Sequence, residues 1–211
     1  MFTGIIEEIG TIKSIAPQLL SITATKIVED TKPGDSIAVN GICLTVKNIR
    51  KGSFDVDLMP ETLKRSSLNY LHYGDKLNLE RAMPANGRFG GHFVEGHIDD
   101  TGRVEAVIPE SEAVIMRISL KPELNKYIVE KGFIAVDGVS LTIVECQRYS
   151  FSVSMVNFTR QHTTLGFIRP GQYVNIEVDI ISKYLEKFNR KPGKDAIDFL
   201  VGDDLTRSRW N

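Results

Sequence analysis

The 211-residue sequence predicts an all-β protein that contains two tandem copies of one small domain and ends in an amphipathic helix. Three observations support this fold class. The chain carries a long internal repeat, each copy shows the apolar–polar alternation that is typical of β-strands, and the periodicity changes to that of a helix after Asp179. Short strands that are separated by frequent turns indicate a closed barrel or a sandwich.

The repeat relates residues 37–80 to residues 134–177 at a shift of 97 positions, and 14 of these 44 positions are identical. Its clearest part is the pair of phrases "AVNGICLTV" (38–46) and "AVDGVSLTI" (135–143). The N-terminal "TGIIEEIGTI" also matches "EGHIDDTGRV" (95–104), at a shift of 92. Such a long period indicates a duplicated domain and not a solenoid. We place the first domain at 1–91, the second at 92–182, and the helix with its tail at 183–211.

Within each copy, alternation predicts β-strands, and Gly with Asp, Asn or Pro predicts the turns between them. The clearest strands lie at 54–58, 76–80, 151–155 and 173–178, and the clearest turns at 32–35, 40–41, 73–75, 137–138 and 169–171. The dipeptides Asn40-Gly41 and Asp137-Gly138 are hairpin signals. Short helical stretches are expected at 26–31 and 122–129.

After residue 179, the segment "ISKYLEKFNRK" predicts a helix with Ile181, Tyr184, Leu185 and Phe188 on one face. The "KPG" at 191–193 should end it, and residues 195–211 are compatible with one more short helix. The apolar face either contacts other subunits or packs on the chain's own barrel, and the pattern alone leaves both open.

The composition excludes several classes of partner. A formal net charge of -1 argues against nucleic acid or an anionic membrane as the main partner. The apolar runs are too short for a membrane-spanning helix, and no signal peptide is visible at the start. Because Cys43 and Cys146 have no framework spacing, we expect reduced thiols and a cytoplasmic protein.

Differences between the two copies point to chemistry. Cys43 corresponds to Ser140, so the position is either a small buried residue or a polar group that both copies direct inward. His97 corresponds to Ile5 and is either a satisfied edge residue or a proton-transfer group. His92, His97, Asp99 and Asp100 match no standard zinc spacing, and "RFGG" (88–91) is interpreted as the connection between the domains.

Five segments together resemble the riboflavin synthase family, whose members carry two lumazine-binding repeats. They are "MFTGIIEEIG", "NGICLTV", "DGVSLTI", "GGHFVEGHID" and "YIVEKGFIAVDG", and the resemblance spans residues 1–186 in the right order. It implies two six-stranded antiparallel Greek-key barrels and a C-terminal helix that holds a homotrimer. It also implies a transferase that dismutates 6,7-dimethyl-8-ribityllumazine, with the N-barrel of one subunit facing the C-barrel of a neighbour and with no cofactor or metal.

The resemblance carries site residues over to both barrels. In the N-barrel the implied pocket residues are Gly4, Ile5, Ile6, Cys43, Leu44, Thr45, Asp57, Leu58, Met59, Pro60, Glu61 and Thr62. In the C-barrel they are Gly96, His97, Ile98, Lys131, Ser140, Leu141, Thr142, Ser154, Met155, Val156, Asn157, Phe158 and Thr159. Asn157 and Phe158 replace Pro60 and Glu61, so the two pockets are expected to hold the ribityl chain differently.

Two identical substrate molecules must react differently, so the two pockets need unlike groups. We expect His97, with Ser140 and Thr142, to transfer protons in the C-barrel, and Cys43 to assist addition or departure in the N-barrel. Three other classes compete with the enzyme. They are a non-enzymatic lumazine- or flavin-binding antenna protein of the same fold, the barrel domain of a flavin reductase, and an oligonucleotide-binding pair of barrels.

Overall fold

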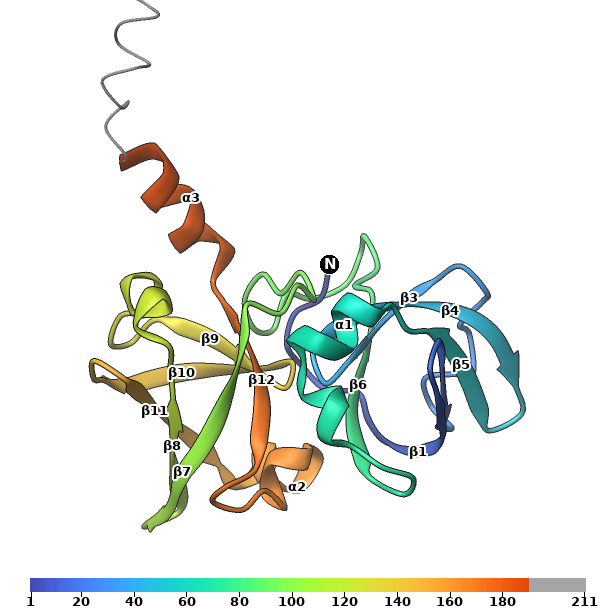
Figure 1. Cartoon of the computed structure of the whole chain (residues 1–211), viewed down its shortest axis with the longest axis horizontal. Helices are drawn as coiled ribbons and strands as arrows, with labels where there is room; N and C mark the ends of the chain where they lie inside the picture. Colours follow the sequence, from blue (N-terminus) through green and yellow to red (C-terminus); the bar gives the residue numbers. More distant parts are fainter. Residues whose placement is uncertain (190–211) are drawn as a thin grey trace, which may run out of the picture. The chain divides into compact units, whose positions relative to one another are not determined.

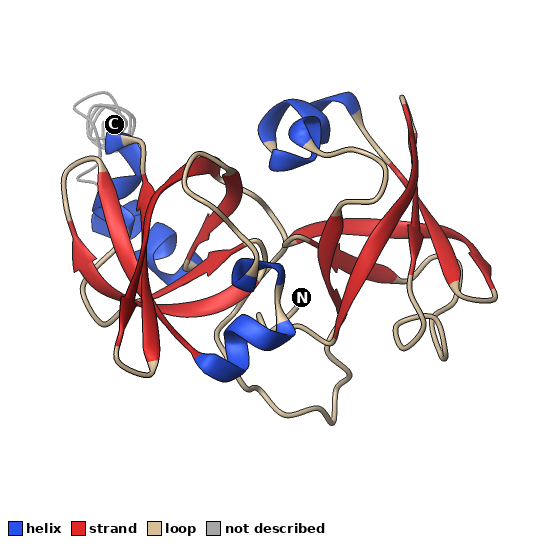
Figure 2. Ribbon diagram, turned by 90° about the horizontal axis from the view of Figure 1, so that it is seen from below, coloured by secondary structure: helices blue, strands red, loops and turns tan. Residues whose placement is uncertain are grey.

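The computed structural model describes residues 1–189, and within this range the chain forms two closed six-stranded antiparallel barrels (Figures 1 and 2). The predicted all-β class and the duplication are therefore confirmed. The four strands predicted from alternation are all present, within one or two residues of the expected bounds.

The first barrel, or N-barrel, has the cyclic strand order β1-β2-β5-β4-β3-β6. Its strands are β1 (Glu8–Ala16), β2 (Leu19–Thr23), β3 (Ser36–Val39), β4 (Ile42–Arg50), β5 (Ser53–Asp57) and β6 (Lys76–Arg81). Strands β3, β4 and β5 follow one another as hairpins, and β6 returns to pair with β3. This arrangement is a Greek key.

The second barrel, or C-barrel, repeats that order strand for strand, as β7-β8-β11-β10-β9-β12. Its strands are β7 (Asp100–Glu110), β8 (Ala113–Ser119), β9 (Phe133–Val136), β10 (Val139–Cys146), β11 (Ser150–Val156) and β12 (Tyr173–Val178). Each barrel encloses its own apolar core, which includes the buried Phe54 in the first and the buried Phe151 in the second. A third, small apolar cluster of Phe2, Ala38, Val94 and Ala135 combines residues from both halves.

The helical turns differ from the predicted ones. Residues 26–31 form turns and no helix, so that prediction was wrong. The Glu8 carboxylate accepts the N–H groups of Thr25 and Ile27, and Thr31 Oγ1 donates to the Ile27 carbonyl. These bonds satisfy the backbone without a helix. The stretch predicted at 122–129 is a 3₁₀ helix, Pro122–Tyr127.

Two short α-helices were not predicted as helices. They are α1 (Pro60–Arg65) and α2 (Asn157–His162), which follow β5 and β11 at equivalent places, and each precedes a 3₁₀ turn, Ser67–Tyr70 or Thr164–Gly166. Six residues are too few to establish a helical period in a sequence. Both helices lie within or next to segments that the sequence assigned to ligand binding.

The predicted C-terminal helix is present as α3 (Ile180–Asn189), and its Ile181, Tyr184, Leu185 and Phe188 are all exposed. The predicted helix end at 191–193 and the second short helix at 195–211 lie outside the described residues. Among the described helices, none has both the length and the apolar character needed to span a lipid bilayer.

The two barrels meet where their β3–β4 and β9–β10 hairpins touch. Asn40 and Asp137 have positive φ angles of 44°, as the predicted hairpin turns require. A Cβ atom added to Gly41 would lie 2.6 Å from the Gly138 nitrogen, so only glycine fits at this contact. The repeat thus preserves both Asn/Asp-Gly pairs because the hairpins pack on each other.

Two fully buried asparagines join the barrels by hydrogen bonds. The Asn78 side chain donates to the Asp137 carbonyl and accepts the Thr164 N–H, while that of Asn175 donates to the Asn40 carbonyl and accepts the Ser67 N–H. Each bond crosses from one barrel to the other. The identity of Asn78 and Asn175 in the repeat therefore has a structural explanation.

Candidate functional site

Two equivalent segments, residues 3–6 and 95–98, run between the barrels and build the candidate sites. Each precedes the first strand of its own barrel and is fastened there by a buried carboxylate. Glu80 on β6 accepts the N–H groups of Thr3 and Gly4, and Glu177 on β12 accepts those of residues 95–97. Burial raises the pKa of Glu80, although the bonds from Thr3 and Gly4 oppose that rise.

On its other side, each segment pairs with the opposite barrel. The Ser140 N–H donates to the Gly4 carbonyl at 2.9 Å, and the Cys43 N–H donates to the Gly96 carbonyl at 2.9 Å. Both glycines have positive φ, and a Cβ on either would approach within 2.6 Å of a Ser140 or Cys43 atom. These two glycines let the segments reach Cys43 and Ser140.

This pairing exchanges two of the expected groups of residues. Ile6 packs against the C-barrel core and Ile98 against the N-barrel core. The sequence interpretation had placed residues 4–6 in the N-barrel pocket and residues 96–98 in the C-barrel pocket, whereas the structure pairs each segment with the other barrel. Sequence order suggested that placement because each segment leads into its own barrel, whereas the backbone bonds join it to the other.

The N-barrel site therefore brings together residues 43–45, 57–62 and 96–98. Leu44 is buried on β4, and Thr45 is exposed beside it. Met59, just after β5, is 63% exposed, and the Glu61 carboxylate bonds Arg65 one turn along α1. That bond and the positive charge of Arg65 lower the pKa of Glu61. Glu61 thus has an internal partner in addition to any ribityl contact.

His97 lies at the N-barrel site and not at the C-barrel site. Its neighbour Gly96 is bonded to Cys43, and its own imidazole Nδ1 lies 3.6 Å from Glu95 Oε2. The His97 side chain is 73% exposed, whereas Cys43 is partly buried against the apolar cluster at the barrel junction. The backbone bond between Gly96 and Cys43 therefore brings residue 97 to the same candidate site as the thiol.

The C-barrel site brings together residues 140–142, 154–159 and 4–6. Leu141 is buried and Thr142 exposed, as their counterparts are in the first barrel. Lys131, at a positive φ of 65°, donates its backbone N–H to Ile143 and so lies at the adjacent end of β10. Phe158 is 69% exposed and stacks on His162 with 4.0 Å between ring centroids.

His92 is a further residue of the C-barrel site. Its Nδ1 lies 2.7 Å from Ser140 Oγ, and its ring is buried and stacked on Phe133. The sequence interpretation considered His92 only as a metal ligand, and among the described residues no group of three or more His, Cys, Asp or Glu side chains could hold a metal ion. The two glycines directly before it, Gly90 and Gly91, were the available sequence signal of a close approach at this position.

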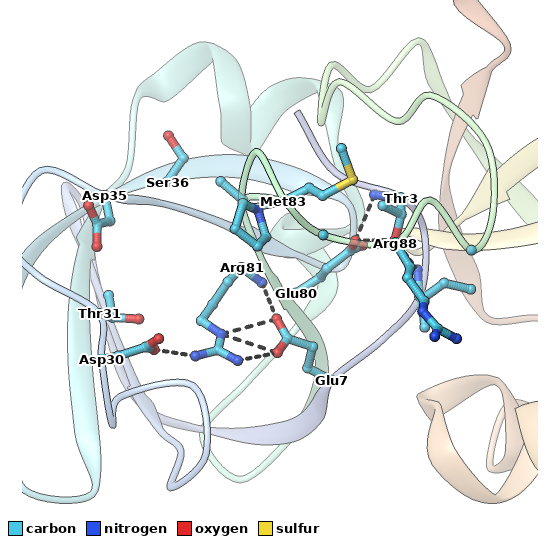
Figure 3. Close-up of a pocket in the computed structure, with 15 residues that line it drawn as sticks. Thr3, Glu7, Asp30, Thr31, Asp35, Ser36, Glu80, Arg81, Met83 and Arg88 are labelled. Carbon is cyan, nitrogen blue, oxygen red and sulfur yellow. Dashed lines mark hydrogen bonds and ion pairs between the residues drawn. The ribbon is translucent and has the colours of Figure 1, made fainter.

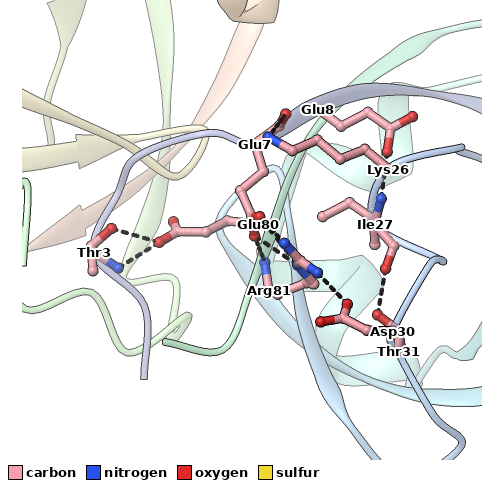
Figure 4. Close-up of polar contacts among 9 residues, drawn as sticks. All are labelled: Thr3, Glu7, Glu8, Lys26, Ile27, Asp30, Thr31, Glu80 and Arg81. Atoms are coloured by element: carbon pink, nitrogen blue, oxygen red, sulfur yellow. Dashed lines mark hydrogen bonds and ion pairs between the residues drawn. The ribbon is translucent and has the colours of Figure 1, made fainter. Parts of the chain in front are cut away.

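A cavity of about 630 Å³ opens beside β3 and β6 of the N-barrel (Figure 3). Of the predicted site residues, only Ile5 lines it. Arg81 extends across the cavity and binds Glu7 and Asp30, as Figure 4 shows. Burial alone would raise the pKa of Glu7, but its bonds with Arg81 lower it. Several charged groups that line the cavity thus pair with one another, and the cavity lies largely outside the two candidate sites.

The sequence and the fold both match known proteins. The lumazine binding domain model matches twice, at residues 3–82 and 95–179. Riboflavin synthase of Actinobacillus pleuropneumoniae is 48% identical over 210 residues, which cover 95% of this chain and 98% of the relative. Riboflavin synthase of Bacillus subtilis is 50% identical and covers 90% and 91% of the two chains. The chain belongs to the riboflavin synthase family.

The fold comparison agrees with this family. A crystal structure of LumP complexed with 6,7-dimethyl-8-(1'-D-ribityl)lumazine superimposes with a TM-score of 0.76 at 27% identity, covering 84% of this chain and 99% of that chain. LumP complexed with riboflavin gives a TM-score of 0.78 at 28% identity. The resemblance inferred from the five sequence segments is therefore confirmed, and the structure adds how this riboflavin synthase family member places its candidate residues in two unlike sites.

Proposed function

We propose that this protein is a riboflavin synthase and catalyses the last step of riboflavin biosynthesis. Two molecules of 6,7-dimethyl-8-ribityllumazine give one riboflavin and one 5-amino-6-(ribitylamino)uracil by transfer of a four-carbon unit, which is a transferase reaction. The observation that carries this proposal is 43–51% identity to proteins of that name over 89–95% of the chain. The two lumazine-binding repeats supply one site for each substrate molecule.

Each site offers similar groups for holding a pteridine ring. Backbone N–H and carbonyl groups at the strand ends and the exposed hydroxyls of Thr45 and Thr142 suit its amide edge, and the neighbouring apolar side chains suit its faces. Holding two rings in a reactive orientation would itself lower the barrier.

The side chains that differ between the two sites give the two lumazine molecules different roles in the reaction. The reaction needs a proton removed from an acidic methyl group of one lumazine and a nucleophile that adds to the ring of the other. We assign proton transfer to His97 and nucleophilic assistance to Cys43, both at the N-barrel site, and in the facing arrangement proposed below each of them would act on a different lumazine ring. Ser140 and Thr142, at the C-barrel site, bond the second lumazine and complete the proton path.

We further propose a homotrimer in which the N-barrel site of one subunit faces the C-barrel site of its neighbour. The exposed apolar side chains of Met59 and Phe158, one at each site, are suited to such a contact. The exposed apolar residues of α3 are suited to another, so we assign subunit assembly to the segment that begins at residue 183, after barrels at 1–91 and 92–182. Since Cys43 and Cys146 are both free thiols, we assign the protein to the cytoplasm.

The direct test is to incubate the purified protein with 6,7-dimethyl-8-ribityllumazine alone. We expect riboflavin fluorescence to appear while two lumazines disappear for each riboflavin formed. Tight lumazine binding without turnover would contradict the proposal and favour the alternative, a non-enzymatic lumazine- or flavin-binding protein of the same fold.

A further inference from the structure

The connector between the barrels is shaped to fit the C-barrel site. A Cβ atom on Gly91 would lie 2.8 Å from Ser140 Cβ, 2.9 Å from Ser140 Oγ and 2.1 Å from the Thr3 carbonyl oxygen. No side chain can occupy that position without moving the backbone of residue 3. The connector therefore passes in direct contact with Ser140, and this contact explains why glycine precedes His92.

The His92 side chain is fixed by contacts on several sides. Its backbone N–H donates to the Thr3 carbonyl at 3.1 Å, and its ring stacks on Phe133 at 5.3 Å between centroids, with only 8° between the planes. Only 5% of the residue is exposed. Among residues 1–189, the polar partner of its ring is Ser140 Oγ, 2.7 Å from Nδ1, and the buried Nε2 has no hydrogen-bond partner there.

Burial makes this histidine a neutral imidazole near pH 7. Burial lowers its pKa, and the negative charge of Asp179 opposes that shift only in part. A neutral ring bonds Ser140 in either tautomer, by accepting the hydroxyl proton or by donating to the oxygen. The tautomer that accepts the hydroxyl proton fixes the rotation of the Ser140 O–H bond, whereas the tautomer that donates occupies one lone pair of the oxygen and leaves the hydroxyl proton for another acceptor.

We propose that His92 is a positioning residue of the C-barrel site, which holds the Ser140 hydroxyl in the one orientation that bonds the lumazine bound there. His92 acts through Ser140 and does not itself contact the substrate. The segment "GGHFVEGH" would then provide one histidine to each site, His92 beside Ser140 and His97 beside the bond between Gly96 and Cys43. The inference rests on the proposed function, since it gives Ser140 a substrate to bond.

Four variants test this role by steady-state kinetics with 6,7-dimethyl-8-ribityllumazine. His92→Phe keeps a flat ring that can stack on Phe133 but removes Nδ1, and His92→Asn places an amide atom near the position of Nδ1. We expect Ser140→Ala and His92→Phe each to lower kcat about tenfold, the cost of one orienting hydrogen bond, with KM changed less. His92→Asn should recover to within about threefold of the wild type, and the double variant His92→Phe/Ser140→Ala should be no slower than either single.

The exposed His72, which lies in the turn before β6, provides the matched control. His72→Phe should not change kcat. If His92→Phe turns over like the wild type, if His92→Asn is as slow as His92→Phe, or if the two losses multiply in the double variant, the positioning role is refuted. If His92→Phe does not fold, the comparison of His92→Asn with Ser140→Ala decides alone. If the wild type forms no riboflavin, the proposed function fails instead, and the same variants then test positioning through lumazine affinity.

Discussion

The N-barrel site combines Cys43 with His97, whereas the C-barrel site has Ser140 and Ile5 at the equivalent positions and adds His92 from the connector. The backbone around them is the same in both. Glu80 and Glu177 hold the two segments, Gly4 and Gly96 let them approach, and Asn78 and Asn175 join the barrels. One backbone arrangement accommodates both sets of side chains, so the fold itself does not require the two sites to differ. The differences between their side chains are therefore better explained by different roles in catalysis.

The two sites can act together only across the proposed subunit contact, so removal of α3 and the residues after it should reduce the rate most. Truncation after Asp179 should give monomers whose rate falls by about two orders of magnitude or more, because one subunit could no longer place two substrates together. Sedimentation and turnover measured on the same sample check this. A fully active monomer would contradict a site shared between subunits, since both roles would then be present in one chain.

The second test removes the imidazole of His97 from the N-barrel site. His97→Gln should lower kcat by about a hundredfold, the usual scale for a general acid–base, while lumazine still binds. The reciprocal change at the other site, Ile5→His, should not restore the rate. Equal turnover of His97→Gln and the wild type would show that this histidine is not needed.

The third test gives the N-barrel site a serine at position 43, the residue type that the C-barrel site has at the equivalent position 140. Cys43→Ser keeps a small polar side chain, and we expect normal folding with a rate that falls roughly tenfold, because a hydroxyl is a much weaker nucleophile than a thiol at neutral pH. Thermal unfolding and riboflavin formation check the two parts. An unchanged rate would reduce Cys43 to a packing residue.

The smallest effect concerns the hairpin turns, where Asp137 stands in place of Asn40. Burial raises the pKa of Asp137 to about 7, against an ordinary value near 3.8. The unfolded chain therefore ionises first, and stability is lost as the pH rises from about 4 to about 7. Asp137→Asn should raise the free energy of unfolding by about 1–3 kcal/mol at pH 8 and have little effect at pH 4, with no change in turnover.

Asn175 donates its N–H to Asp137 as Asn78 does to Asn40, so the replacement keeps the hydrogen bond. Denaturant unfolding at both pH values measures the difference. The reverse change, Asn40→Asp, should destabilise the protein at pH 8. An Asp137→Asn variant that is less stable at pH 8 would mean that the carboxylate is ionised and bonded in the folded state.

Much of the fold could be predicted because the duplication repeats its signals. The strands at 151–155 and 173–178 alternate clearly, and both Asn/Asp-Gly turns have one geometric explanation. The short helices α1 and α2 could not be predicted, since six residues do not establish a helical period. The turns at 26–31 were predicted as a helix because the group that fixes them, the Glu8 carboxylate, lies far from them in the sequence.

The way in which the candidate site residues group in space could not be predicted from the sequence. Residues 4–6 and 96–98 each lead into their own barrel, and nothing local reveals that Gly4 bonds Ser140 and Gly96 bonds Cys43. His92 was missed as a site residue because its role depends on a contact 48 positions away. Backbone pairing between residues that are far apart in the chain is the feature that is hardest to predict from a single sequence.

If two unlike sites from different subunits form one active site, two variants that are each defective at a different site should complement each other when they are co-expressed. One variant carries His97→Gln at the N-barrel site and the other Ser140→Ala with Thr142→Ala at the C-barrel site, and each should be slow alone. Co-expressed at equal amounts, they should recover about a quarter of the wild-type rate, because half of the subunits supply an intact N-barrel site and half an intact C-barrel site. A rate no higher than the mean of the two separate variants would contradict a shared site.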